Sequence, residues 1–230
     1  MRTSAVLLLA LAATATPAQA PAVQQKVAEF KQVLAANQQA RRQYTWLETT
    51  QIAYQGVVKS TKLSDCQYTG TNPKPVCTEL SLQRAPLSGG FIRKHIEEKK
   101  LAELKAYMDS VRTLIAEYVP MQSALIDKAY QTGNVLVSAD PVAGTDRLVI
   151  TNYRQAGDTV TIIFNATTKK LQWVKVSSWL DKKSATVALS VQFANLPNGV
   201  FYASRKNLTA AAAGVGVTVV SSDFAEAIKP

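Results

Sequence analysis

The sequence contains few of the residues that most often perform catalysis or bind metals. It has one histidine, His95, and two cysteines. A general base or a metal ligand needs partners at hydrogen-bond or coordination distance, and the residues around His95 offer only lysines and the pair Glu97-Glu98. The sequence has no G-x-S-x-G, H-E-x-x-H or P-loop motif. We therefore predict no catalytic residue, no metal ligand and no cofactor, and we expect that the protein is not an enzyme.

The sequence also lacks an apolar run long enough to cross a bilayer. The apolar run from Ala5 to Ala13 follows Arg2 and precedes the small residues Ala18-Gln19-Ala20. This order is typical of a secretory signal peptide over residues 1–20. Cleavage after Ala20 would leave a proline first, which fits a peptidase subsite poorly, so cleavage after Ala22 is an alternative. Both alternatives predict export, to the periplasm or as a secreted protein.

The two cysteines, Cys66 and Cys77, lie eleven positions apart across a loop rich in Gly, Asn and Pro. Exported chains meet oxidising conditions, in which an even number of cysteines usually pairs. The segments VVKSTKLSDCQY and VCTELSLQ on either side are rich in Val, Thr and Leu, as the strands of a hairpin would be. The spacing does not fit a C-x-x-C redox pair, and histidine partners for zinc are missing. The pair therefore predicts a structural disulfide.

Acidic residues are fewer than basic ones, with 16 Asp and Glu against 26 Lys and Arg and a net charge of +10. The basic residues are spread along the chain, which is what an ordinary solvated surface would also give. A basic protein outside the cytoplasm can be drawn to an anionic membrane surface, an acidic polysaccharide or an acidic envelope protein. We predict no nucleic-acid partner, because the chain is expected to be exported.

Apolar spacing and turn residues predict the elements in order. A helix is expected from residue 21 to about 44, a three-stranded meander over 45–83, a linker over 84–90, and a helical lid insert at about 91–132. Strands separated by short turns fill the rest of the chain, which favours antiparallel neighbours. We therefore expect residues 21–230 to form one α+β domain: a large curved antiparallel sheet, or half-open β-barrel, with helices packed on its concave face.

The strands TVTIIFN and LQWVKVSSWL have large apolar residues at both alternating sets of positions, which predicts burial on two sides. Aromatic residues in strands can line an apolar pocket, although core packing is the commoner explanation. Glu48 shares a strand face with Trp46 and could orient a ligand head group, with a partly exposed strand glutamate as the alternative. The predicted ligand-binding residues are Trp46, Glu48, Ile52, Tyr54, Ile163, Trp173 and Trp179.

Two segments resemble a known family. The hairpin FNATTKKLQWVKV and the late segment VQFANLPNGVFY are similar to parts of the outer-membrane lipoprotein carriers and receptors, the LolA/LolB family. The resemblance implies a half-open β-barrel with helices as a lid over an apolar cavity that takes acyl chains. It carries over no functional residue, and the helical stretch 91–132 is longer than the family's lid.

The expected function is therefore that of a periplasmic non-enzymatic binding protein for an apolar or acylated ligand. The alternative is an envelope structural or protein-interaction domain with a filled core. The expected partners are an apolar or acyl ligand, an anionic membrane surface or an envelope protein.

Overall fold

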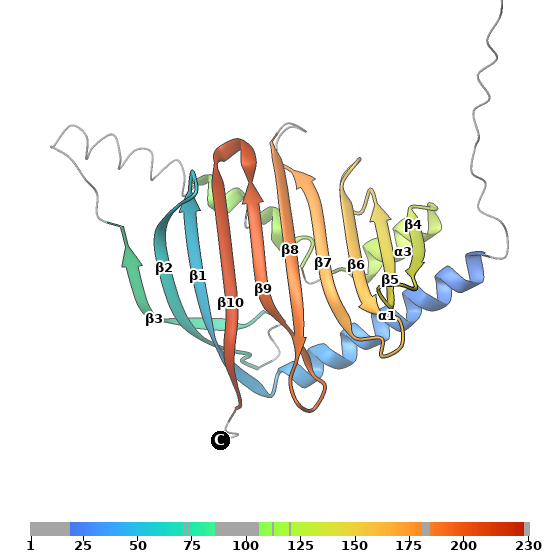
Figure 1. Ribbon diagram of the computed structural model, residues 1–230, viewed down its shortest axis with the longest axis horizontal. Helices are drawn as coiled ribbons and strands as arrows, with labels where there is room; N and C mark the ends of the chain where they lie inside the picture. Colours follow the sequence, from blue (N-terminus) through green and yellow to red (C-terminus); the bar gives the residue numbers. More distant parts are fainter. Residues whose placement is uncertain are drawn as a thin grey trace, which may run out of the picture.

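The chain forms one antiparallel sheet of ten strands that does not close on itself (Figure 1). The structure, a computed structural model, describes residues 19–227 except 71, 73, 86–105, 112, 120 and 181–184. The strand order is β3-β2-β1-β10-β9-β8-β7-β6-β5-β4. The strands are β1 (Tyr44–Tyr54), β2 (Val57–Gln67), β3 (Val76–Arg84), β4 (Val135–Asp140), β5 (Thr145–Thr151), β6 (Thr159–Asn165), β7 (Leu171–Trp179), β8 (Thr186–Asn195), β9 (Phe201–Ala210) and β10 (Val215–Glu226).

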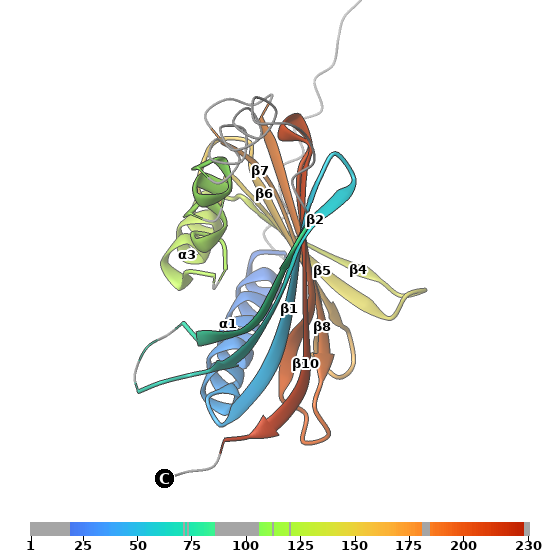
Figure 2. The ribbon, with the colours of Figure 1, turned by 90° about the vertical axis from the view of Figure 1, so that its left-hand side faces the viewer.

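The helices described are α1 (Gln19–Arg41), α3 (Ser123–Gln131) and the short 3-10 helix η1 (Ala211–Ala213). Residues 106–111 and 113–116 are also helical, in agreement with the second half of the expected helix. Figure 2 shows α1 and α3 along the same face of the sheet, which we call the helix face. Among the described residues, no helix is both long and apolar enough to cross a membrane.

Some expectations concern residues that the structure does not describe. These are residues 1–18 of the expected signal peptide, most of the expected linker, the first half of the lid helix up to residue 105, and His95. The α+β fold with one large curved antiparallel sheet agrees with the sequence-based prediction. The three-stranded meander of β1 to β3 and the later run of antiparallel strands agree with it as well.

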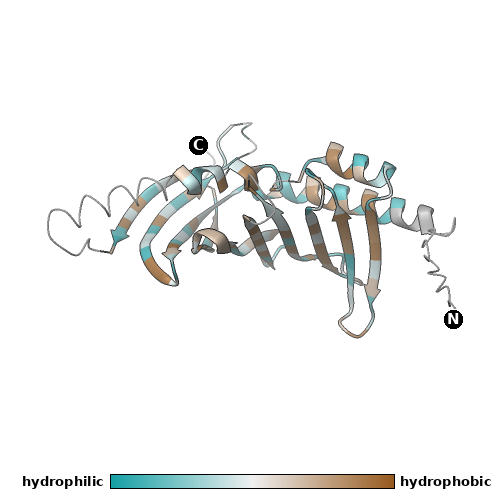
Figure 3. Ribbon diagram, turned by 90° about the horizontal axis from the view of Figure 1, so that it is seen from above, coloured by the Kyte–Doolittle hydropathy of each residue, from teal (hydrophilic) through white to brown (hydrophobic). Residues whose placement is uncertain are grey.

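The hydrophobic core lies between the helices and strands β5 to β8. Alternate residues of these strands are buried on the helix face and are paired across the strands in register, as in the row Leu148, Ile162, Val174 and Val191. Each such side chain contributes about 1.5–3 kcal/mol when fully buried. The core is completed by residues of the helices and by Tyr118, which follows the helical segment 113–116: Val27, Phe30, Val111, Leu114, Tyr118, Ile126 and Ala129. Viewed from above, apolar and polar residues alternate along the strands (Figure 3).

The opposite face of the sheet, which we call the outer face, carries the second set of side chains. Ile163 and Trp173 are paired in register on this face and are half-buried, while Lys175 and Ser177 beside them are exposed. The prediction that β6 and β7 are buried on both sides is therefore wrong. The large apolar side chains on the second face remain partly accessible because no described helix packs over them.

The disulfide between Cys66 and Cys77 is present and joins β2 to β3, as predicted. The two cysteines are direct cross-strand partners, with a Cα–Cα distance of 4.1 Å. The hairpin of β1 and β2 turns at Gln55 and Gly56. Both residues have positive φ (49° and 78°), and a turn of this kind matches the twist of the two strands. All nine residues of β3 are exposed, and β3 is the last strand at one end of the sheet, so it forms an open edge among the residues that the structure describes.

Candidate functional site

A cavity of about 230 Å³ lies between α1 and the sheet, at the end of β6 and the starts of β7 and β9. Its walls are mainly apolar side chains: Phe30 and Val33 from the helix, and Phe164, Leu171 and Phe201 from the sheet. Polar side chains also line it, namely Lys26, Glu29, Gln32 and Lys169. The arrangement gives an apolar interior with charged groups beside it, which is the usual composition of a small-molecule site.

The sequence of α1 explains why this helix packs here. Val27 and Phe30 are three residues apart, so they share one helix face, and both are buried against the sheet. Two turns after Phe30, the buried Asn37 makes two hydrogen bonds to Phe201. Its Nδ2 donates to the carbonyl oxygen at 2.7 Å, and its Oδ1 accepts from the backbone N–H at 2.8 Å. This pair of bonds holds the first residue of β9, and with it the Phe201 ring, at the cavity wall.

The charged groups beside the cavity form one linked set. The Lys26 ammonium donates to Asp146 Oδ2 at 2.7 Å, and Lys169 Nζ lies 3.6 Å from the same oxygen. The Asp146 side chain is only 10% exposed, whereas the two lysines are 27% and 40% exposed. The hydrogen bond to Asp146 raises the pKa of Lys26 above its ordinary value. Lys26 also lies 5.9 Å from the centroid of the Phe164 ring, so the ammonium group adjoins the apolar wall directly.

The seven predicted ligand-binding residues do not line this cavity and do not lie together. Trp46, Glu48, Ile52 and Tyr54 share the helix face of β1, because Ile52 pairs with Val217 and Val217 with Leu208 of that face. Ile163 and Trp173 lie on the outer face, and Trp179 lies at the end of β7. Residues of the two faces cannot contact the same ligand unless it passes through the sheet.

Trp46 is packed rather than available. The residue is only 3% exposed. Its ring is stacked on the ring of Phe224, and the centroids of the Phe224 and Tyr68 rings each lie 5.6 Å from the Trp46 centroid. The guanidinium of Arg41 lies 5.8 Å from the Trp46 ring centroid, within cation–π range. These contacts match the core-packing explanation for this aromatic residue.

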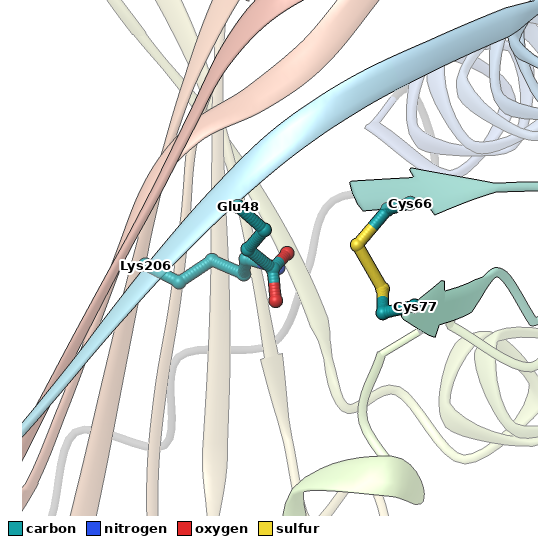
Figure 4. Close-up of a disulfide and its surroundings, with 4 residues drawn as sticks. All are labelled: Glu48, Cys66, Cys77 and Lys206. Carbon is teal, nitrogen blue, oxygen red and sulfur yellow. A yellow bond between two sulfur atoms is a disulfide. The ribbon is translucent and has the colours of Figure 1, made fainter. Parts of the chain in front are cut away.

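Glu48 forms an ion pair with Lys206 on the helix face, with 2.8 Å between Oε2 and Nζ (Figure 4). A carboxylate oxygen of Glu48 and the sulfurs of Cys66 and Cys77 lie within 4.8 Å of one another. Cysteine binds metals as a thiolate, and neither sulfur is a thiolate while the disulfide is formed. The cluster is therefore an ion pair beside a disulfide, and its geometry does not constitute a metal site.

A second cavity, of about 570 Å³, lies on the helix side at the other end of β7. Trp179 and Leu180 contribute to it, together with the ion pair between Glu117 and Arg154. The remaining lining residues are Asp109, Ser110, Thr113, Leu114 and Gln155. Trp179 is therefore the one predicted ligand-binding residue that lines either cavity.

Sequence reasoning missed a buried polar network that connects the helical segment to the sheet. Asp158 is fully buried and accepts backbone N–H groups from Tyr153, Arg154 and Gln155 at 2.6 to 3.0 Å. It also accepts the hydroxyl of Tyr118 at 2.5 Å. Burial, together with the hydrogen bond to Asp158, raises the pKa of Tyr118 far above its ordinary value, and burial raises the pKa of Tyr153 as well. The turn sequence around Asp158 gives no signal for its distant partner Tyr118, which lies 40 positions away.

The comparisons with known proteins concern the fold alone. No protein-family model matches the sequence, and no curated protein matches it. Among solved structures, the chain is similar to a DUF1329 family protein from Desulfovibrio piger, with a TM-score of 0.44 and 10% identity over 92% of this chain and 94% of the other. It is also similar to a LolA superfamily protein from Nitrosomonas europaea, with a TM-score of 0.35 and 12% identity over 87% of this chain and 94% of the other. The LolA superfamily is also the one that the two segments FNATTKKLQWVKV and VQFANLPNGVFY resemble in sequence.

Proposed function

We propose that the protein is a non-enzymatic binding protein of the periplasm, or a secreted one, that holds an apolar or acylated ligand between α1 and the sheet. The observation that carries the proposal is the apolar cavity walled by Phe30, Val33, Phe164, Leu171 and Phe201. The helices then act as a cover over the concave side of the curved sheet. The signal peptide expected at residues 1–20 supplies the export.

The size of the cavity sets what it can hold. An enclosed apolar cavity of roughly 150 Å³ is already large enough to bind benzene, and typical small-molecule sites are about 300–1,000 Å³. At about 230 Å³ the cavity accepts part of an acyl chain and is too small for a complete phospholipid. The polar part of the ligand therefore remains outside, beside Lys26 and Lys169, where either ammonium group can donate a hydrogen bond to it.

Ligand retention provides the direct test. The mature protein, purified without detergent from its own exported fraction, is examined by native mass spectrometry and then titrated with a dansyl-labelled fatty acid. Substitution Val33→Trp places a large ring in the cavity from the half-buried helix position that lines it. The matched control is Leu125→Trp, since Leu125 is equally half-buried on α3 and does not line the cavity. We expect uptake of the probe by the wild type and by Leu125→Trp, and none by Val33→Trp.

Two results would count against the proposal in different ways. If the wild type shows only the mass of the protein and also takes up no dansyl-labelled fatty acid, the proposed function itself is contradicted. Equal uptake by the wild type and Val33→Trp would show that a ligand binds elsewhere. Both variants are compared with the wild type by circular dichroism, so that a misfolded variant is recognised.

A second candidate function, an envelope interaction domain, is favoured by the open edge at β3. Its side chains Val76, Leu80 and Leu82 are 44%, 56% and 36% exposed, and no strand of the described residues pairs with its outer backbone groups. An extended peptide of a partner protein can add to such an edge as an eleventh strand. Substitution Leu80→Lys would disrupt this interaction and leave uptake of the fatty acid unchanged, which separates the two functions.

A further inference from the structure

The outer face of strands β5 to β9 carries three exposed cations, and none of the described residues of these five strands places an acid beside them on that face. Arg147 of β5 and Arg205 of β9 lie in one cross-strand row, with Ile163, Trp173 and Gln192 between them. Lys175 lies in the neighbouring row, and its ammonium group is 5.6 Å from the centroid of the Trp173 ring. Strands are about 4.8 Å apart, so the row spans roughly 19 Å of surface. All three cationic side chains belong to exposed residues.

Acidic side chains are missing from the outer face of strands β5 to β9 because of the sequence of these strands. Strands β5 to β9 contain one acidic residue, Asp146, and it lies on the helix face, where it binds Lys26. At the margin of the outer face, the Asp140 carboxylate accepts the backbone N–H of Ala143 in the β4–β5 turn. The outer positions of β5 to β9 otherwise hold Thr, Ser, Asn, Gln and apolar residues.

Apolar side chains are exposed beside these cations. Leu136 of β4 is 64% exposed and pairs with Val149 on the outer face. Val142, in the β4–β5 turn, is 98% exposed. Figure 2 shows that the β4–β5 hairpin projects from the sheet on the side opposite to α3. Cations next to exposed aliphatic and aromatic side chains are the combination that binds the interface of an anionic membrane.

We propose that the outer face is a docking surface for an anionic lipid bilayer, with Arg147, Lys175 and Arg205 near the phosphates and Leu136 and Val142 at the acyl boundary. A purely polyanionic partner would account for the cations but would leave the exposed aliphatic side chains without a role. The surface goes beyond the proposed function, since it lies on the face of the sheet opposite to the helix-face cavity. The two sites share no residue, so each can fail without the other.

Vesicle binding by the mature protein tests the proposal. The probes are vesicles of phosphatidylglycerol and phosphatidylethanolamine in equal parts, and vesicles of phosphatidylcholine alone, each assayed by co-sedimentation. We expect binding to the anionic vesicles only, with a large loss at about 1 M salt, where the Debye length is about 3 Å. Each cation near an anionic surface is expected to strengthen binding about fivefold, so the triple variant R147Q/K175Q/R205Q should bind roughly a hundredfold more weakly.

A variant of equal charge change is the matched control. K74Q/R84Q/K128Q also removes three exposed cations, none of which lies on β5 to β9. We expect this control to bind close to wild type, and L136S/V142S to reduce the binding that persists at high salt. If both triple variants lose the same amount of vesicle binding, then net charge alone explains the binding, and the proposal is overturned. Wild-type binding by R147Q/K175Q/R205Q would overturn it too, as would binding to heparin without binding to the anionic vesicles. Uptake of the dansyl-labelled fatty acid should be unchanged in all these variants, because none of them alters the cavity.

Discussion

Removal of the Tyr118 hydroxyl provides a specific test of how the helices are held to the sheet. Substitution Tyr118→Phe removes one oxygen atom and keeps the ring, which lies 5.6 Å from the ring of Tyr153. The lost hydroxyl donates to Asp158 at 2.5 Å and lies 2.8 Å from Ser178 Oγ. Because Tyr118 follows the helical segment and Asp158 precedes β6, this hydroxyl is a direct polar connection between the helices and the sheet.

The magnitude follows from the burial of both partners, each of which is 0% exposed. Hydrogen bonds to charged groups contribute about 1.5–3 kcal/mol, and a buried acceptor that loses its partner is not rescued by solvent. Asp158 would keep its three backbone donors, so the carboxylate would not be left bare. We therefore expect a loss of about 2 kcal/mol in the free energy of unfolding, which for a domain of this size lowers Tm by about 4–8 °C.

Equilibrium unfolding in urea, followed by far-UV circular dichroism, measures this loss. The expected result is a lower midpoint with an unchanged slope, because the change should affect stability and not the surface exposed on unfolding. The control is Tyr202→Phe, because this ring contacts Phe224, with centroids 4.1 Å apart, and its hydroxyl makes no hydrogen bond to any described residue. A Tyr118→Phe midpoint equal to that of the wild type, or a loss no larger than that of Tyr202→Phe, would refute the assigned role of the network.

Two further predictions concern pH and the disulfide. The folded-state pKa of Tyr118 lies above the unfolded value of about 10, so its stabilisation is complete below pH 10 and is lost as the pH rises further, at up to about 1.4 kcal/mol per pH unit. Urea titrations at alkaline pH should therefore show a steeper decline for the wild type than for Tyr118→Phe, and parallel declines would contradict this. The double variant C66S/C77S, which opens a loop of sequence separation 11, should lose about 3 kcal/mol. A reductant should lower the wild-type midpoint to that of the variant and leave the variant unchanged; a reductant-insensitive wild type would show that the bridge does not contribute.

Much of the fold could be predicted because its signals are local. Turn residues separate the strands, and the strand composition around Cys66 and Cys77 indicated a hairpin with a cross-strand bridge, which the structure contains. Within the helical insert expected at about 91–132, the residues 106–111 and 113–116 are helical. In each case, residues within about four positions of one another carry the information.

The candidate site could not be predicted because it depends on how distant strands are aligned. Alternation fixes which residues of one strand share a face, but not which face of the next strand they join. The register also shifts at several places, including one between Ile163 and Phe164. Large apolar residues at Trp46 and Trp173 therefore gave the same signal in sequence, although they lie on opposite faces of the sheet. Residues such as Phe201, which line the cavity, gave no signal of their own because the cavity exists only once α1 has packed.

The position of β10 between β1 and β9 has a consequence for the order in which the protein can fold. The first strand pairs with the last, as in the pairing of Ile52 with Val217. Among the described strands, hydrogen bonds therefore join the meander of β1 to β3 to the other six strands only through β10. Until those last residues are synthesised, β1 and β9 each present an open edge on which another chain could pair. Contacts between such distant parts of a chain also slow folding. The sheet can therefore be completed only after the whole chain has been synthesised, and the incomplete chain is the form most prone to aggregation.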